Sequence, residues 1–425
     1  MRKALFVMCG LGVIVAAWAS IEDGILDAGS GIREPRFGAR EAQGSGFGGR
    51  PTTREGLKAI IDSGRARVAR DPADTAAAVE LADALMRGAR VDGDASLTVE
   101  AGRVLRTALQ QSPSDYMARR MLAVVYLSQH RFAAALTEAA AAQKIRPADA
   151  WNYAIAGDAL LELGRYDEAF DSFDQVMTRR PDAGAYARVA YARELQGDLD
   201  GAVRLMKMSA EATSRRDVEA QAWSYAQLGN LYLLHDRLED AEREFDRADF
   251  LFPAHPYAMN GRVRLLIARH RYADALDLSR RLPVTPESLA TQGDLLARLG
   301  HRDDAETMYG EAERVEREGW EQEHPQPGAL ARFLAERGRN IPEAIALAER
   351  AALERQDVNT MDALAWSYFR AGRIADAAAA IERATRLGTL DPRIRCHASA
   401  IAWSRRTTLP AGDPVCDPLD PRGWS

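Results

Sequence analysis

Four histidines recur at similar places in the chain, and they are the residues whose type and spacing most suggest a metal site. His130, His235, His270 and His301 stand in the segments QHRF, LHDR, RHRY and GHRD, each at an expected turn between two helices. Packed helices lie about 8–10 Å apart, so neighbouring turns are too distant for their imidazoles to share a zinc ion at about 2.0 Å per ligand. We therefore expect polar turn residues here, and we predict no metal and no cofactor.

The sequence lacks the motifs that build catalytic and nucleotide-binding sites. It has no GxxxxGK[ST] loop, no GxGxxG after a predicted strand, no HExxH and no GxSxG. Its many carboxylates lie on the exposed faces of expected helices, where a solvated surface is their ordinary role. The residues therefore indicate a protein that is not an enzyme, with no catalytic residue to name.

The elements that position all these residues follow from an alanine that recurs about every 34 residues. A small residue precedes it by twelve positions, as Gly157 precedes Ala169, and a bulky residue follows it by four, as Phe173 does. An offset of four places side chains on one face of a helix, so each repeat is predicted to contain two helices with one packed stripe. The alanines are Ala135, Ala169, Ala202, Ala241, Ala275, Ala305, Ala344 and Ala377.

Several of these units resemble the tetratricopeptide repeat. The segments AIAGDALLELGRYDEAFDSFDQVMTRRP and AQLGNLYLLHDRLEDAEREFDRADFLFP match the signature positions of that family, and the resemblance covers roughly residues 74–405. It implies an all-α fold: a right-handed superhelical α-solenoid of about eight to nine antiparallel helix pairs. It also implies a protein that binds other polypeptides, as repeat stacks of this kind do.

The N-terminus has the features of a secretory signal. Arg2 and Lys3 precede an apolar run of 14 residues, and small residues follow at Ala17 and Ala19. We predict a signal peptide over residues 1–19 that is cleaved after Ala19, with an uncleaved membrane anchor as the alternative. The mature protein is then an exported bacterial protein, periplasmic or extracellular, and no later segment is apolar enough to span a membrane.

Composition divides the remaining chain into three parts. Residues 20–54 are rich in glycine and are expected to be a flexible tether, residues 55–405 form the solenoid, and residues 406–425 are a proline-rich tail. After signal cleavage two cysteines remain, Cys396 in the last helix and Cys416 in the tail. An even pair in an oxidising compartment is often bridged, and two free thiols are the alternative.

The charge of the chain argues against nucleic acid as a partner. The formal net charge is −6, both signs are interspersed, and there is no basic block. The partner is therefore expected to be a protein or peptide of unknown identity, and the sequence leaves the oligomeric state open.

In the resembled family the concave face of the superhelix holds peptides. On the first helix of a repeat, the residue after the small position is rotated by about 100° toward that face. With neighbours one turn further on, this geometry selects a mixed set of aromatic, apolar and acidic side chains. The candidate groove contacts are Trp151, Asp158, Leu161, Tyr191, Asn230, Leu233, Asp294, Trp366 and Phe369.

The prediction is therefore a non-enzymatic scaffold of the cell envelope that binds a protein or peptide along its concave groove. A scaffold subunit that uses its outer surface is one alternative. A second is a carbohydrate-handling or enzyme-accessory module, because aromatic and acidic groups also suit sugar rings and hydroxyls. A contiguous ladder of exposed aromatic side chains would favour sugar, whereas isolated anchors between polar groups would favour peptide.

Overall fold

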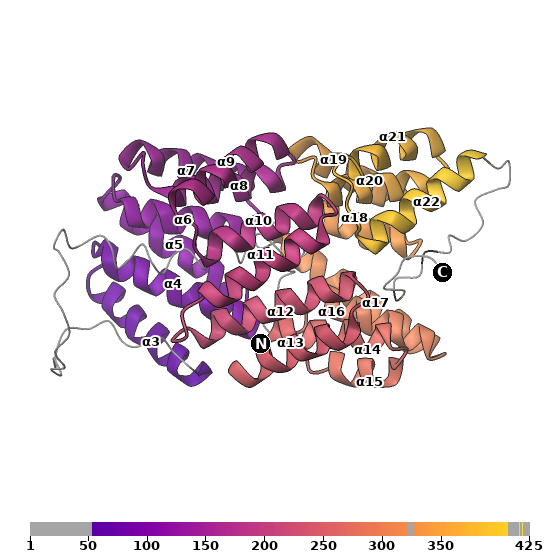
Figure 1. Cartoon of the computed structure of the whole chain (residues 1–425), viewed down its shortest axis with the longest axis horizontal. Helices are drawn as coiled ribbons and strands as arrows, with labels where there is room; N and C mark the ends of the chain where they lie inside the picture. The colour runs from indigo at the N-terminus through magenta and orange to yellow at the C-terminus, as the bar shows by residue number, and fades with distance from the viewer. Residues whose placement is uncertain (1–52, 322–325, 407–415, 417–418, 420–425) are drawn as a thin grey trace.

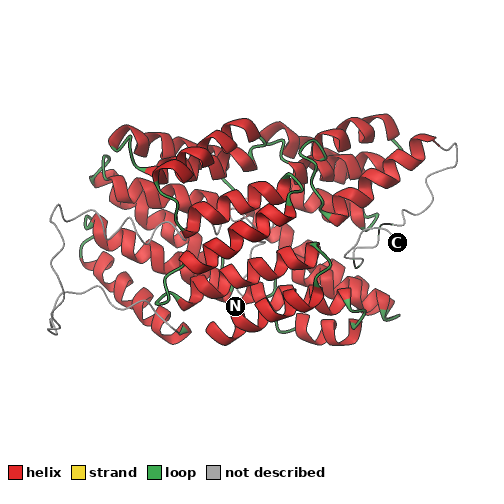
Figure 2. Ribbon diagram, in the orientation of Figure 1, coloured by secondary structure: helices red, strands yellow, loops and turns green. Residues whose placement is uncertain are grey.

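A computed structural model of the protein describes residues 53–321 and 326–406 together with Cys416 and Leu419. Over these residues the regular structure is entirely helical, as Figure 2 shows. The predicted signal peptide, nearly all of the predicted tether and most of the predicted tail lie outside this part of the chain. The helices are α3 (Arg54–Arg70), α4 (Thr75–Asp92), α5 (Ser96–Gln111), α6 (Tyr116–Ser128), α7 (Phe132–Ile145), α8 (Ala150–Glu162), α9 (Tyr166–Arg179), α10 (Ala183–Leu195), α11 (Leu199–Ala212), α12 (Val218–Leu234), α13 (Leu238–Leu251), α14 (Pro256–Ala268), α15 (Tyr272–Ser279), α16 (Pro286–Arg298), α17 (Arg302–Glu321), α18 (Pro327–Glu336), α19 (Ile341–Glu354), α20 (Val358–Arg370), α21 (Ile374–Ala384) and α22 (Pro392–Arg406).

Successive helices form pairs that follow the predicted repeat. Within the described ranges the pairs run from α4–α5 to α20–α21, and α3 and α22 flank them (Figure 1). The turn inside a pair contains a residue in the left-handed region, which is a glycine at Gly164 and Gly372 but a histidine at His130 and His270. Two of the recurring histidines thus shape their turns through the backbone.

The predicted packing of the repeated alanine is confirmed. All eight alanines lie in the second helix of a pair, and none is more than 2% exposed. The small residue on the first helix makes room for the bulky one on the second. A Cβ added to Gly157 would lie 2.6 Å from Cε1 of Phe173, and one added to Gly229 would lie 2.5 Å from Cε1 of Phe245. The absence of a Cβ therefore permits the close approach of the two helices.

The chain also closes on itself, which the repeat pattern does not predict. Near the N-terminus, Arg90 donates from Nε to Glu219 Oε1 at 2.7 Å, and His255 lies 3.1 Å from the same carboxylate oxygen. These side chains are buried, so helix α4 is joined to α12 and to the start of α14 by an enclosed polar network. Arg54 adds hydrogen bonds to the carbonyl oxygens that precede α14.

A second closure joins the C-terminal repeats to the middle of the chain. The backbone N–H of Gln356 donates to Leu163 O at 3.2 Å, and that of Val358 donates to the Tyr166 hydroxyl at 2.8 Å. One buried apolar cluster contains side chains from α8–α10 and from α18–α22. In Figure 1, α19 lies next to the pair α8–α9 in the upper part of the view. The C-terminal repeats therefore cover a surface that an open solenoid would expose.

Candidate functional site

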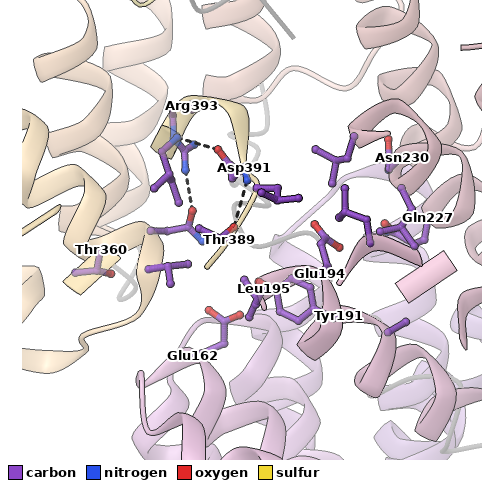
Figure 3. A pocket seen from close by; sticks show the side chains of 18 of the residues that line it. Glu162, Tyr191, Glu194, Leu195, Gln227, Asn230, Thr360, Thr389, Asp391 and Arg393 are labelled. Carbon is purple, nitrogen blue, oxygen red and sulfur yellow. Dashed lines mark hydrogen bonds between the residues drawn. The ribbon is translucent and has the colours of Figure 1, made fainter. Parts of the chain in front are cut away.

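A cavity of about 230 Å³ lies where the middle repeats meet the C-terminal repeats (Figure 3). Helices α8, α10, α11 and α12 line one side, and α18, α20 and the start of α22 line the other, while α14 and α16 each contribute one side chain. The cavity therefore exists only because the chain closes. Its lining is Glu162, Ala187, Ala190, Tyr191, Glu194, Leu195, Leu199, Met206, Gln227, Asn230, Leu231, Leu234, Arg264, Glu287, Gln326, Gly328, Ala329, Arg332, Arg355, Val358, Asn359, Thr360, Thr389, Leu390, Asp391, Arg393 and Ile394.

Four carboxylates from separate elements line this space, and one of them, Glu287 on α16, lies beside Arg332. Figure 3 shows Glu162 at the end of α8, Glu194 on α10 and Asp391 before α22 around the cavity. Burial raises the pKa of Glu162 above its usual value, although Arg355 opposes the shift. Burial and then the negative charge of Asp391 raise the pKa of Glu194 to about 7. Burial thus disfavours the charged forms of both glutamates.

Most arginines of the lining are engaged by other acidic groups. Arg355 lies 3.1 Å from Asp357 and 3.7 Å from Glu162. Arg393 lies 3.1 Å from Asp362 and also donates to Asn359 at 2.7 Å. These pairs hold the guanidinium groups against the C-terminal repeats.

Two further arginines complete the charged lining. Arg332 lies 3.8 Å from Glu287 on α16. Arg264 on α14 donates weakly to Asn230 at 3.5 Å. Burial lowers the pKa of Arg264, while Asp391, Glu194 and Glu287 act in the opposite direction.

Two predicted groove contacts, Tyr191 and Asn230, do line the cavity. Both are half-buried, and burial raises the pKa of the Tyr191 hydroxyl well above its usual value. The structure does not bring the other candidates to this site. Leu233 is half-buried against the core, and Asp294 accepts hydrogen bonds from the Tyr309 hydroxyl at 2.8 Å and from Arg337 at 2.7 Å.

The prediction that Trp366 faces an open groove is wrong. Its ring is 1% exposed and stacks on His397 of α22, with ring centroids 3.8 Å apart. Phe369, with its ring 4.8 Å from that of Trp366, is buried in the same place. The prediction from helical rotation assumed that the concave side of α20 is open, whereas α22 covers this side.

The prediction that Trp151 and Leu161 are exposed groove contacts is also wrong, because these residues are only 3% and 2% exposed, respectively. The guanidinium of Arg120 lies over the Trp151 ring at 4.5 Å. Asp158 is fully buried and accepts from Arg188 Nε at 3.0 Å, and the side chain of Arg188 is equally enclosed. This aspartate therefore joins neighbouring repeats inside the core and has no access to a ligand.

Sequence reasoning missed Glu162, Arg264 and Asp391 as site residues. Glu194 lies one turn beyond Tyr191 on the same helix, so the helical geometry that selects Tyr191 also reaches it. Nothing in the sequence points to the others, because residues as distant as 162 and 391 meet only through the closure of the chain.

The structure joins Cys396 and Cys416 in a disulfide, with Cα atoms 5.8 Å apart. Cys396 is buried in α22, and Leu419, three residues beyond Cys416, is 5% exposed within an apolar cluster of α14–α17. The bridge therefore holds the described part of the tail against the repeats.

Other features bear on ligands and membranes. Over the described residues, no three His, Cys, Asp or Glu side chains gather closely enough to hold a metal ion. Among the helices of the same ranges, none is both long and apolar enough to cross a membrane.

Comparisons with known proteins agree with the helix-pair architecture. A solved structure described as a human IFIT1 dimer with m7Gppp-AAAA has a TM-score of 0.50 at 13% identity, and the likeness covers 79% of this chain and 77% of that one. At this identity the likeness shows the fold alone.

Two relatives found by sequence similarity are named for the tetratricopeptide repeat. Tetratricopeptide repeat protein 36 of Homo sapiens is 36% identical over 95 residues, and that of Mus musculus is 34% identical over 95 residues. Each match covers 22% of this chain and 50% of the relative, so the chain matches only half the length of these proteins. A model of the tetratricopeptide repeat matches residues 89–150, 156–217 and 363–406. Together with the alanine period and the observed helix pairs, these matches show that the chain contains tetratricopeptide repeats.

Proposed function

We propose that this protein is a non-enzymatic scaffold of the cell envelope that binds a protein or peptide partner at the cavity between its middle and C-terminal repeats. The observation that carries the proposal is the cavity itself. It combines acidic, basic, amide and aliphatic groups from repeats far apart in the sequence. A few polar groups that converge on a concave, partly apolar site are the usual composition of a recognition site.

The lining favours a peptide over a carbohydrate. Tyr191 is the one aromatic side chain among the described residues that border the cavity. Sugar binding through a ladder of stacked rings therefore has no support here. An isolated aromatic anchor beside the Asn230 amide suits an extended polypeptide, whose backbone offers both donors and acceptors.

We also propose that the protein is exported, and two observations support this. The basic and apolar N-terminal segment has the pattern of a signal peptide. The Cys396–Cys416 disulfide is a bond that persists in oxidising compartments and is rare in the cytosol. Both features fit a mature protein that works in the envelope or beyond it.

The proposal is tested by capturing partners from an envelope fraction with the mature chain, which begins at Ser20. Tyr191→Ala is expected to weaken capture at least tenfold at an unchanged melting temperature, because it removes a partly exposed anchor. Tyr186→Ala on the same helix is the control, since Tyr186 lies outside the cavity lining. Equal capture by Tyr191→Ala and the wild type would overturn the cavity as the binding site.

A further inference from the structure

We propose that the cavity recognises a basic side chain of the partner, a lysine or an arginine, and holds its cationic end among Glu162, Glu194 and Asp391. This inference rests on the proposed function and adds the chemistry of the ligand. It follows from where the three carboxylates lie, which cations already neutralise the lining, and how much space is left.

The three carboxylates face one enclosed space without direct hydrogen bonds to one another. Glu162 is only 5% exposed, and the one contact that the described residues give its carboxylate is Arg355 at 3.7 Å. That separation is too long for a hydrogen bond, so a buried carboxylate that lines the cavity lacks a close donor. A bound ammonium or guanidinium group would supply one.

Glu194 lies on the same side of the space as Glu162, and Asp391 lies on the side formed by the C-terminal repeats. The charge of Asp391 acts directly on Glu194, which places the two carboxylates within electrostatic reach of each other. The Asp391 side chain accepts one hydrogen bond, from the backbone N–H of Ile394 at 3.1 Å, and that bond leaves its charge in place. Two like charges that face each other across an enclosed space are both stabilised when a cation enters between them.

Most arginines of the lining are shared with acidic groups that lie outside it. Arg355 lies near the carboxylates of both Glu162 and Asp357. Arg393 pairs with Asp362 and also faces Asp391. A third guanidinium, that of Arg264, faces both Glu194 and Asp391 as well as Glu287.

Arg332 already lies beside two carboxylates, those of Glu287 and Glu336. The lining has four acidic side chains and four arginines, but Asp357, Asp362 and Glu336, which lie outside the lining, also pair with these arginines. Once these partners are counted, negative groups outnumber positive ones. A basic ligand would add the counter-charge that the shared arginines leave incomplete.

The size of the cavity fits one side chain better than a whole small molecule. About 230 Å³ lies below the roughly 300–1,000 Å³ that drug-sized ligands occupy. Leu195 and Leu390 also border the space, so the aliphatic stem of a lysine or arginine has apolar surface to pack against.

The test uses calorimetric titration of the mature protein with the peptide acetyl-Ala-Ala-Lys-Ala-Ala-amide. The matched probe replaces lysine with norleucine, which keeps the stem and removes the charge. We expect saturable binding of the lysine peptide and at least tenfold weaker binding of the norleucine peptide. Glu194→Gln should weaken lysine-peptide binding at least tenfold without lowering the melting temperature. Glu211→Gln, an exposed glutamate on α11, should bind as the wild type does.

Equal binding of the two peptides, no saturable binding of the lysine peptide, or full binding by Glu194→Gln would overturn the inference. The proposed function is judged separately by capture from the envelope fraction. Capture that needs Tyr191 but tolerates Glu194→Gln would reject the basic ligand and leave the peptide-binding function standing. Capture that is indifferent to Tyr191 would reject the function itself.

Discussion

Buried charges in this protein serve two different purposes. The Asp158–Arg188 pair is fully enclosed, with Nε of the arginine 3.0 Å from both carboxylate oxygens. Glu162 and Glu194, by contrast, border a cavity, and the described residues show no arginine that holds either carboxylate this closely. The first arrangement fixes the contact between repeats, and the second leaves charge available to a ligand.

Removing one member of the enclosed pair should be costly. Asp158→Asn leaves the buried Arg188 guanidinium without its counter-charge, so we expect the free energy of unfolding to fall by about 3–5 kcal/mol. Urea unfolding of the two proteins measures this difference. Asp171→Asn on the exposed face of α9 is the control and should change stability by less than about 0.5 kcal/mol. A wild-type midpoint for Asp158→Asn would contradict the structural role.

The pKa of Glu194 predicts how stability depends on pH. Its carboxyl has a usual value of 4.5 and a value of about 7 in the folded protein, so the folded state binds more protons than the unfolded state between these values. Stability should therefore fall as pH rises through this window, with a slope of at most about 1.4 kcal/mol per pH unit for this group.

Comparison of wild type and Glu194→Gln isolates this contribution. Glu162 and Glu316, whose pKa values burial also raises, act in the same direction in both proteins. Chemical unfolding at about pH 5 and about pH 8 should show a smaller loss of stability in the variant. Parallel pH profiles would mean that Glu194 titrates normally.

At the scale of the helix pair, sequence and structure agree because the determinants are local. The alanine stripe and the preceding small residue lie within one repeat, so their offsets alone specify the contact. The single groove contacts were less predictable. Tyr191 reaches the cavity, but Trp366 occupies the equivalent position and is covered by α22. The position of a residue within its repeat does not predict whether a later helix covers it.

The glycine and aromatic contact inside a pair yields a stability prediction. Phe245 is fully buried, and its ring lies against Gly229 from its own pair and Gly261 from the next one. Gly229→Ala places a methyl group 2.5 Å from Cε1 of that ring, so we expect a loss of about 1–3 kcal/mol from overpacking. Thermal or urea unfolding would measure it.

Gly310 provides the matched control for this substitution. It lies inside helix α17, and a Cβ there has no neighbour within 4 Å. Gly310→Ala should stabilise the protein by up to about 1 kcal/mol, because alanine has the higher helix propensity. If Gly229→Ala gained stability as Gly310→Ala does, the contact with Phe245 would not explain the glycine at 229.

At the scale of the whole molecule, the closure is the feature that the repeats do not encode. A solenoid is stabilised by contacts between neighbouring repeats, and the period predicts only those. The hydrogen bond from Val358 to Tyr166 joins residues 192 positions apart. The carboxylate of Glu219 contacts both Arg90 and His255. Such pairs depend on the accumulated curvature of many repeats. The candidate cavity depends on them too, which is why most of its charged lining was not predicted.

Two glycines with the same backbone conformation allow the contribution of this closure to be measured. Gly164 and Gly372 both lie in the turn of a helix pair, with φ of 77° and 75°. Alanine at either position should cost about 1–2 kcal/mol because of the left-handed backbone. At Gly164 alone, the new Cβ would also lie 2.5 Å from the backbone carbonyl group of Gln356 in the distant C-terminal repeats, whereas Gly372 has no neighbour within 4 Å.

Gly164→Ala should therefore lose more unfolding free energy than Gly372→Ala, because backbone atoms cannot yield as a flexible side chain can. Hydrogen exchange gives an independent readout. The amide of Gln356 donates to Leu163 O across this contact, so it should exchange faster in Gly164→Ala and at the wild-type rate in Gly372→Ala. Lysine-peptide binding should weaken in the first variant alone, since the cavity is assembled across the same interface. Equal stability losses with an unchanged Gln356 amide would show that the two halves hold together without this contact, and that the cavity is positioned by the polar networks elsewhere in the closure.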